Sequence, residues 1–157
     1  MGDRATFDGL SFEVPSGWTS EQPSSNMRVA QYRIAPASGG GEPGECTLFH
    51  FPGQGGSVQA NLERWYGQFT QPDGGSTEAK ARVEKFSAGG LHVTLVQVTG
   101  TYSGGMDSTD GPRTGYQLVA GVVETPEAPW FLKCTGPEAT MISAAPAVRA
   151  LLSTVKP

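Results

Sequence analysis

Gly53-Gln54-Gly55-Gly56-Ser57-Val58-Gln59-Ala60-Asn61-Leu62-Glu63-Arg64-Trp65 is the stretch of this chain that decides the fold class. An apolar strand predicted over residues 45–51 leads into the glycine run, and an amphipathic helix is predicted from Ser57 to about Phe69. Ser57 is a suitable N-cap because its hydroxyl can accept a hydrogen bond from a free amide one turn into the helix. The stretch therefore predicts a fold that mixes strands with helices.

The composition predicts a single domain, residues 1–157, in which a sheet dominates. A chain of 157 residues can bury a sizeable core without help from a metal or a disulfide. The 22 glycines, 12 prolines and only 17% charged residues favour short strands joined by many turns over a helical bundle.

The charge pattern excludes two classes of partner. The net charge is -4 and the eleven Lys and Arg residues do not cluster, so we expect neither nucleic acid nor anionic lipid to bind. No window approaches the roughly 18 apolar residues of a membrane helix, so we expect no membrane insertion by this chain.

The start of the chain, Met1-Gly2-Asp3-Arg4, lacks the apolar stretch of a secretory signal, whereas Asp8-Gly9-Leu10 already reads as the inside of a domain. The compartment is open, and an exported location, periplasmic or lipoprotein-anchored, is expected if a signal was removed upstream.

Alternating apolar and polar residues predict the strands. Residues 10–14, 27–34 and 45–51 read as antiparallel neighbours, and a weaker strand covers 79–86. Residues 91–102 form a long strand whose apolar phase changes between Leu95 and Val96, which a bulge or burial on both faces would explain. Residues 116–123 are apolar on both faces and predict a central strand, with 130–134 as its hairpin partner. The predicted fold is α+β, an antiparallel sheet of about six or seven strands flanked by helices.

A second helix is predicted near the C-terminus. Thr135-Gly136-Pro137-Glu138 has the spacing of a capping box, in which the Thr hydroxyl and the Glu carboxylate each bond a free amide of the first turn. Pro146 lacks an amide and clashes with the preceding turn, so we expect two consecutive helical pieces.

Cys46 and Cys134 are too far apart in sequence for a local metal or redox motif, which leaves a disulfide or two buried thiols. Buried thiols are favoured because Cys46 shares a strand face with Leu48, and Cys134 shares one with Leu132. A catalytic Cys46–His50 pair is not expected, since four residues of strand separate the two by about 13 Å. We predict no catalytic residue.

The glycine run is the candidate ligand site, because free amides and the helix dipole can attract an anion there. A dinucleotide fingerprint would need glycine where Val58 stands, and the P-loop lysine is missing, so a tight strand-to-helix turn is the simpler interpretation. The loop containing Asp107 and Asp110 lacks the terminal Glu of a calcium loop, and we predict no metal and no cofactor. The candidate ligand-binding residues are His50, Gly53, Gln54, Gly55, Gly56, Ser57 and Trp65.

The opening Phe7-Asp8-Gly9-Leu10-Ser11-Phe12-Glu13-Val14-Pro15-Ser16-Gly17-Trp18 resembles the start of the PsbP and Mog1-like superfamily, whose domains begin with a short strand, a proline and a tryptophan. The resemblance implies an antiparallel sheet flanked by helices, one of them C-terminal. The superfamily holds photosystem accessory proteins, a Ran-binding protein and many bacterial exported proteins and lipoproteins of unknown activity. Residues 53–65 and 131–137 are most similar to uncharacterised bacterial members, and no residue carries over a Ran-binding or manganese-cluster role.

These observations lead to one leading hypothesis and two alternatives. The leading one is a non-catalytic binding or accessory module that contacts a protein partner through a sheet face, the glycine hinge or the loop of residues 103–115. The first alternative is a small-molecule-binding protein or enzyme with a pocket between the sheet and the first helix, near Trp65, His50 and Gly55. The second alternative is a self-associating structural protein.

Overall fold

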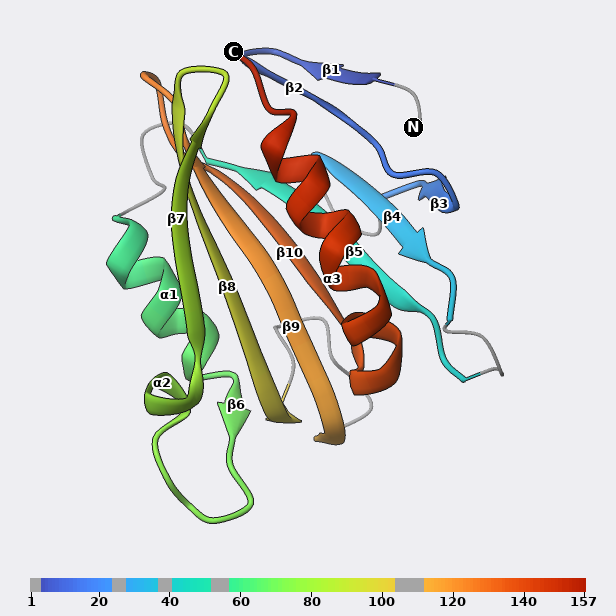
Figure 1. The fold of residues 1–157 in the computed structure, drawn as a ribbon, viewed down its shortest axis with the longest axis vertical. Helices are drawn as coiled ribbons and strands as arrows, with labels where there is room; N and C mark the ends of the chain where they lie inside the picture. Colours follow the sequence, from blue (N-terminus) through green and yellow to red (C-terminus); the bar gives the residue numbers. More distant parts are fainter. Residues whose placement is uncertain (1–3, 24–27, 37–40, 52–56, 104–111) are drawn as a thin grey trace.

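The computed structural model describes residues 4–23, 28–36, 41–51, 57–103 and 112–157 (Figure 1). The described elements, in chain order, are β1 (Arg4–Phe7), β2 (Leu10–Glu13), β3 (Trp18–Glu21), β4 (Ala30–Ile34), β5 (Gly44–His50), α1 (Val58–Tyr66), β6 (Phe69–Thr70), α2 (Thr77–Lys80), β7 (Arg82–Ala88), β8 (Leu91–Tyr102), β9 (Arg113–Glu124), β10 (Trp130–Pro137) and α3 (Glu138–Ser153). No helix among these is long and apolar enough to span a membrane.

The main sheet is antiparallel and runs in the order β3-β4-β5-β10-β9-β8-β6. Strand β7 also pairs with β8, along its N-terminal half, while β6 pairs with the C-terminal end of β8. The prediction of an α+β fold with an antiparallel sheet of about six or seven strands is confirmed. Seven strands follow one another in the sheet, and β7 pairs with β8 on the same side as β6. The hairpin of β9 and β10 lies in the middle of this sheet, also as predicted.

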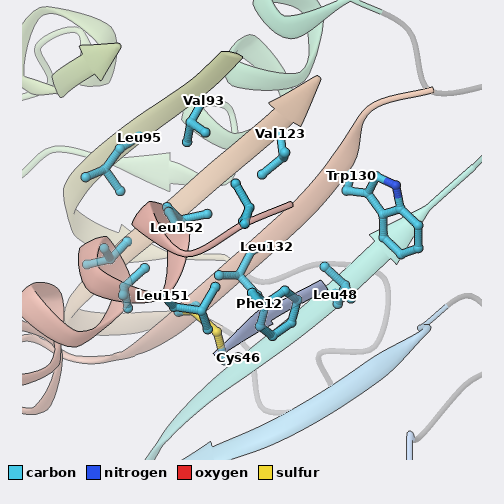
Figure 2. Close-up of a cluster of buried hydrophobic side chains, with 14 of the residues drawn as sticks. Phe12, Cys46, Leu48, Val93, Leu95, Val123, Trp130, Leu132, Leu151 and Leu152 are labelled. Carbon is cyan, nitrogen blue, oxygen red and sulfur yellow. A yellow bond between two sulfur atoms is a disulfide. The ribbon is translucent and has the colours of Figure 1, made fainter. Parts of the chain in front are cut away.

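The sheet carries a helix on each face. Helix α3 covers one face, where it packs in one cluster with Val119 and Val123 of β9. On the other face, Leu118, Ala120 and Val122 of β9 pack in a second cluster with α1. Figure 2 shows the first cluster, with side chains of α3 directed at the sheet. Burying an aliphatic side chain of this size contributes about 1.5–3 kcal/mol relative to leaving it exposed. The prediction that β9 is central and covered on both faces is confirmed.

The change of apolar phase in β8 comes from burial on both faces. Leu91, Val93 and Leu95 belong to the cluster under α3, and Val96 and Val98 belong to the cluster under α1. The pairing of β8 with β9 stays regular through this point and becomes irregular only between Gly100 and Tyr102. Two-sided burial is therefore the correct one of the two predicted explanations.

The predicted pairing of the first strands is confirmed for β4 and β5, which are antiparallel neighbours, and is wrong for β2. β2 pairs with β1 in a separate two-stranded sheet, and the strand beside β4 is β3. Leu10 and Phe12 are buried as their alternation suggests, but in the cluster that contains α3, and β2 is linked to the C-terminal segment through a bridge between Ser11 and Lys156. Alternation shows that one face of a strand is buried, and does not show against which element.

Two predictions about α3 are also wrong. Thr135 remains in β10, and the helix begins at Glu138 after Pro137, with no side-chain hydrogen bond at its N-terminus. The helix then runs unbroken to Ser153 with Pro146 inside it. Pro146 and Ile142, one turn earlier, are both exposed, so water can solvate the carbonyl that the missing amide leaves free.

Cys46 and Cys134 form a disulfide, which corrects the preference for buried thiols. The two cysteines are direct partners in the register of β5 and β10, and both are completely buried in the cluster under α3. The strand faces of both were predicted correctly. Their adjacency depends on the pairing of two strands that lie 88 residues apart in sequence, which no local pattern reveals.

Candidate functional site

Helix α1 begins as the sequence predicts and is held by aromatic packing. The Ser57 hydroxyl accepts a hydrogen bond from the Ala60 amide at 3.0 Å, which confirms the N-cap. The helix ends at Tyr66, earlier than predicted, because Gly67 caps it and Phe69 enters β6. Trp65 is only 4% exposed and meets the Phe131 ring edge-on, with ring centres 6.4 Å apart. Trp65 is therefore a core residue that anchors α1 on the sheet.

His50 lies on the opposite face of the sheet from Trp65. Its ring stacks on Trp130, with centres 3.8 Å apart and planes 5° apart, within the face that α3 covers. The His50 Nε2 is 3.9 Å from a carboxylate oxygen of Glu127 and, like Trp130 Nε1, has no hydrogen-bond partner among the described residues. The structure thus separates two residues that the sequence grouped in one candidate site. Gly53, Gln54, Gly55 and Gly56, and the loop with Asp107 and Asp110, lie outside the described residues.

A groove of about 650 Å³ lies between α1 and β7. Figure 1 shows α1 alongside β7 at this border of the sheet. Four segments line the groove: α1, α2, β7 and the turn from β9 to β10. The lining residues are Ser57, Val58, Gln59, Leu62, Tyr66, Glu78, Val83, Lys85, Glu124, Thr125 and Pro129. Among the described residues, Ser57 is the one predicted site residue in this lining.

The lining of the groove combines apolar and charged side chains. Val58, Leu62 and Val83 are its aliphatic residues, and Val83 is 46% exposed. The charged residues of the lining are Glu78, Lys85 and Glu124, and none of the three forms an ion pair with a described residue. Two carboxylates against one ammonium make the lining net negative.

Tyr66 and Glu78 connect this groove to a second hollow of about 380 Å³ beside β6 and α2. Burial raises the pKa of the Tyr66 hydroxyl, and the Glu78 carboxylate raises this pKa further. The phenol is therefore neutral at physiological pH and available as a hydrogen-bond donor. Thr77 ties α2 to β6 by donating its hydroxyl to the Phe69 carbonyl at 3.1 Å, so this end of the groove has a defined wall.

The described residues offer binding chemistry in the groove and no group of three metal-ligating side chains anywhere. Cys46 and Cys134 carry no free thiol, so the pairing of Cys46 with His50 weighed at the sequence level supplies no nucleophile. Glu78, Val83 and Glu124 were missed as site residues because they come from separate segments. An apolar residue within a charged strand, Val83, is the one local signal that could have marked them.

No family model matches the chain, and neither does any curated protein. Solved structures do resemble it. A Pseudomonas aeruginosa protein of unknown function, PA94, proposed as a regulator, has a TM-score of 0.57 and 15% identity over 99% of this chain and 96% of its own. PsbP of the cyanobacterium Synechocystis matches with a TM-score of 0.57 and 12% identity over 98% of this chain and 90% of its own. LpqN, involved in cell envelope biogenesis of Mycobacterium tuberculosis, matches with a TM-score of 0.52 and 13% identity over 99% of this chain and 84% of its own. The chain has the PsbP/Mog1-like fold, as the resemblance in its opening residues implied.

Proposed function

We propose that this chain is a non-catalytic binding module that holds a protein partner in the groove between α1 and β7. The observation that carries the proposal is the groove itself, whose lining combines exposed Val83 with three charged side chains that form no ion pair with a described residue. Protein–protein contacts use surfaces that combine apolar and polar side chains. The glycine hinge named from the sequence precedes Ser57, which borders this groove.

The shape of the groove favours a macromolecular partner over a small molecule. Most of the lining side chains are exposed, and only Leu62 and Tyr66 are buried. Small-molecule sites bury about 70–90% of the ligand surface, which requires walls on most sides. An open groove suits a ligand that continues onto the surrounding surface.

The disulfide supports an extracytoplasmic location. Disulfides persist in oxidising compartments and are rare in the reducing cytosol. The Cys46–Cys134 bond is buried between central strands, which makes it a structural bond rather than an exposed exchangeable one. LpqN, a fold relative, acts in cell envelope biogenesis. We therefore place the binding module outside the cytoplasm, as an exported protein.

Site-specific crosslinking in the native cells tests the proposed function. A photoreactive amino acid at Gln59, exposed on the groove, is compared with the same group at Ala150, exposed on α3 across the sheet. We expect a discrete crosslinked protein from position 59 only. Equal labelling at the two positions, or none at position 59 while the variant is folded and abundant, would refute a partner in the groove.

A second candidate function is binding of a small molecule at the same place, which the volume of about 650 Å³ favours. Ligand pockets commonly measure about 300–1,000 Å³. Native mass spectrometry of the protein purified from its own cells distinguishes the two functions. A retained compound that is lost when Leu62→Ala opens the wall would favour the small molecule, and an unliganded mass with a crosslink at position 59 would favour the protein partner.

A further inference from the structure

We infer that the groove receives an extended, basic peptide segment of the partner, which adds as a new strand to the edge of β7 and inserts one large apolar side chain beside Val83. This inference rests on the proposed function and specifies its binding mode. It follows from the free edge of β7, from the alternation of the β7 side chains and from the charge of the groove lining.

Strand β7 is an open edge. Arg82–Ala88 pair with β8 on one side, and no other backbone hydrogen bond joins these seven residues to a described residue. An edge strand presents a row of free amides and carbonyls, and an extended peptide can satisfy them by pairing. β7 is also longer than β3, the strand at the opposite edge of the sheet, which has four residues.

The side chains of β7 alternate between the face covered by α3 and the groove. Glu84 accepts two hydrogen bonds from Arg149 of α3, at 3.1 and 2.6 Å, and the Arg149 guanidinium lies over the Phe86 ring. Val83 and Lys85 have the opposite orientation and line the groove. A strand added to β7 would therefore direct every second side chain into the groove.

The dimensions fit a short extended segment. An added strand would lie about 4.8 Å from β7, beside the groove that β7 and α1 line together. The nine residues of α1 make a wall about 13 Å long, which matches about four residues of an extended chain at 3.3 Å each. A segment of this length places two or three side chains in the groove.

The lining specifies the chemistry of those side chains. Val83 favours a large apolar side chain beside it, since such a side chain would cover Val83 surface that is now exposed. Glu78 and Glu124 outnumber Lys85, so basic residues flanking the apolar one are electrostatically preferred. The inferred ligand is an extended segment with a basic, apolar, basic pattern on its groove-facing side.

A second copy of this chain is a poorer occupant. Two β7 edges related by a two-fold axis pair antiparallel about a residue that faces its own copy. At the middle of β7 this residue is Lys85 or Glu84, so like charges would stand directly opposite each other. This repulsion disfavours dimerisation through β7.

Fluorescence anisotropy with synthetic peptides tests the inference on the intact, oxidised protein. The probe is fluorescein-labelled Lys-Thr-Leu-Thr-Lys, whose first, third and fifth side chains share one face. The matched controls are Lys-Leu-Thr-Thr-Lys, with the same composition and the leucine on the other face, and Glu-Thr-Leu-Thr-Glu. We expect both controls to bind at least about five-fold more weakly at low salt.

Protein variants and hydrogen exchange locate the binding. Val83→Thr should weaken binding about five-fold, whereas Ile142→Thr, at the 57% exposed Ile142 on α3, should leave it unchanged. Amide exchange within β7 should slow in the presence of the peptide, because strand addition gives its free amides partners.

Three results would overturn the inference: equal affinity for the first two peptides, equal effects of the two variants, or unchanged exchange in β7. Concentration-dependent dimerisation that Val83→Thr abolishes would also overturn it in favour of a second copy. If these results coincide with a specific crosslink at position 59, strand addition fails while the proposed function stands. If no crosslink forms at position 59 but the peptides behave as expected, the proposed protein partner fails and the peptide site remains.

Discussion

Removing the Cys46–Cys134 disulfide should lower stability by an amount that the chain geometry sets. The bond joins residues 88 apart in sequence and closes a loop that covers more than half of the chain. In the chain-entropy relation, a loop of this length restricts the unfolded state by about 4.6 kcal/mol at 25 °C. For a chain of 157 residues, each kcal/mol of lost stability lowers the melting temperature by about 2–4 °C, so the expected decrease is about 9–18 °C.

Two perturbations isolate the bond from the side chains. Cys46→Ala with Cys134→Ala removes both sulfur atoms, whereas reduction of the natural protein keeps them and removes only the bond. Urea unfolding followed by tryptophan fluorescence measures the loss of free energy in each case. We expect similar losses, with a slightly larger one for the double alanine variant because both cysteines are buried and their removal leaves space.

A thiol titration of the native protein decides whether the reasoning holds. Two free thiols in protein isolated under oxidising conditions would contradict the disulfide and the register of β5 with β10 that places the cysteines opposite each other. Unfolding curves that coincide before and after reduction would contradict the calculated stabilisation of about 4.6 kcal/mol. Two free thiols would also remove the main support for an extracytoplasmic location.

Three further predictions test the fold around the site. Gly136→Ala should lower the free energy of unfolding in urea by about 1–3 kcal/mol, because the new Cβ would lie 2.9 Å from a backbone carbon of β5. Gly67→Ala is the control and should be nearly neutral, since the nearest atoms to its Cβ lie at 3.5 Å. Ser57→Ala should cost about 1 kcal/mol by removing the cap of α1, and an unchanged urea midpoint would contradict the role of this hydroxyl. Hydrogen bonds from Arg149 lower the pKa of the Glu84 carboxyl below its ordinary 4.5, so their stabilisation is complete above that pH and is lost as the pH falls through the lowered pKa. Glu84→Gln should therefore flatten the stability profile on the acid side of pH 4.5, and a profile identical to that of the unsubstituted protein would exclude this linkage.

Patterns that act over a few residues, such as helix capping and apolar periodicity, correctly predicted individual helices and strands. The Ser57 cap and the start of α1 follow from a hydroxyl beside a helical apolar stripe, and both are as predicted. The apolar residues of β9 on both faces predicted a central strand, since no exposed strand could keep such a pattern. The α+β class follows from these elements together.

The failures occur where a pattern does not specify its partner. Trp18–Glu21 has no clear alternation, and it becomes a strand because β4 offers it an edge. Thr135 fits a capping box, but pairing with Leu118 of β9 keeps it in the sheet, because ladder hydrogen bonds and burial outweigh a helix cap. These outcomes depend on contacts with segments far along the chain.

The candidate site shows the same division. The sequence predicted Ser57 as a site residue and a pocket near Trp65, His50 and Gly55, since this hypothesis depends on a strand, hinge and helix along one stretch of chain. The tertiary structure alone decided that Trp65 and His50 lie on opposite faces, that the cysteines meet, and that Val83 and Glu124 share a groove with α1. Periodicity and capping act over a few residues and can be read from them, whereas strand order and register are set by the joint burial of distant segments, and the groove exists only once that burial is complete.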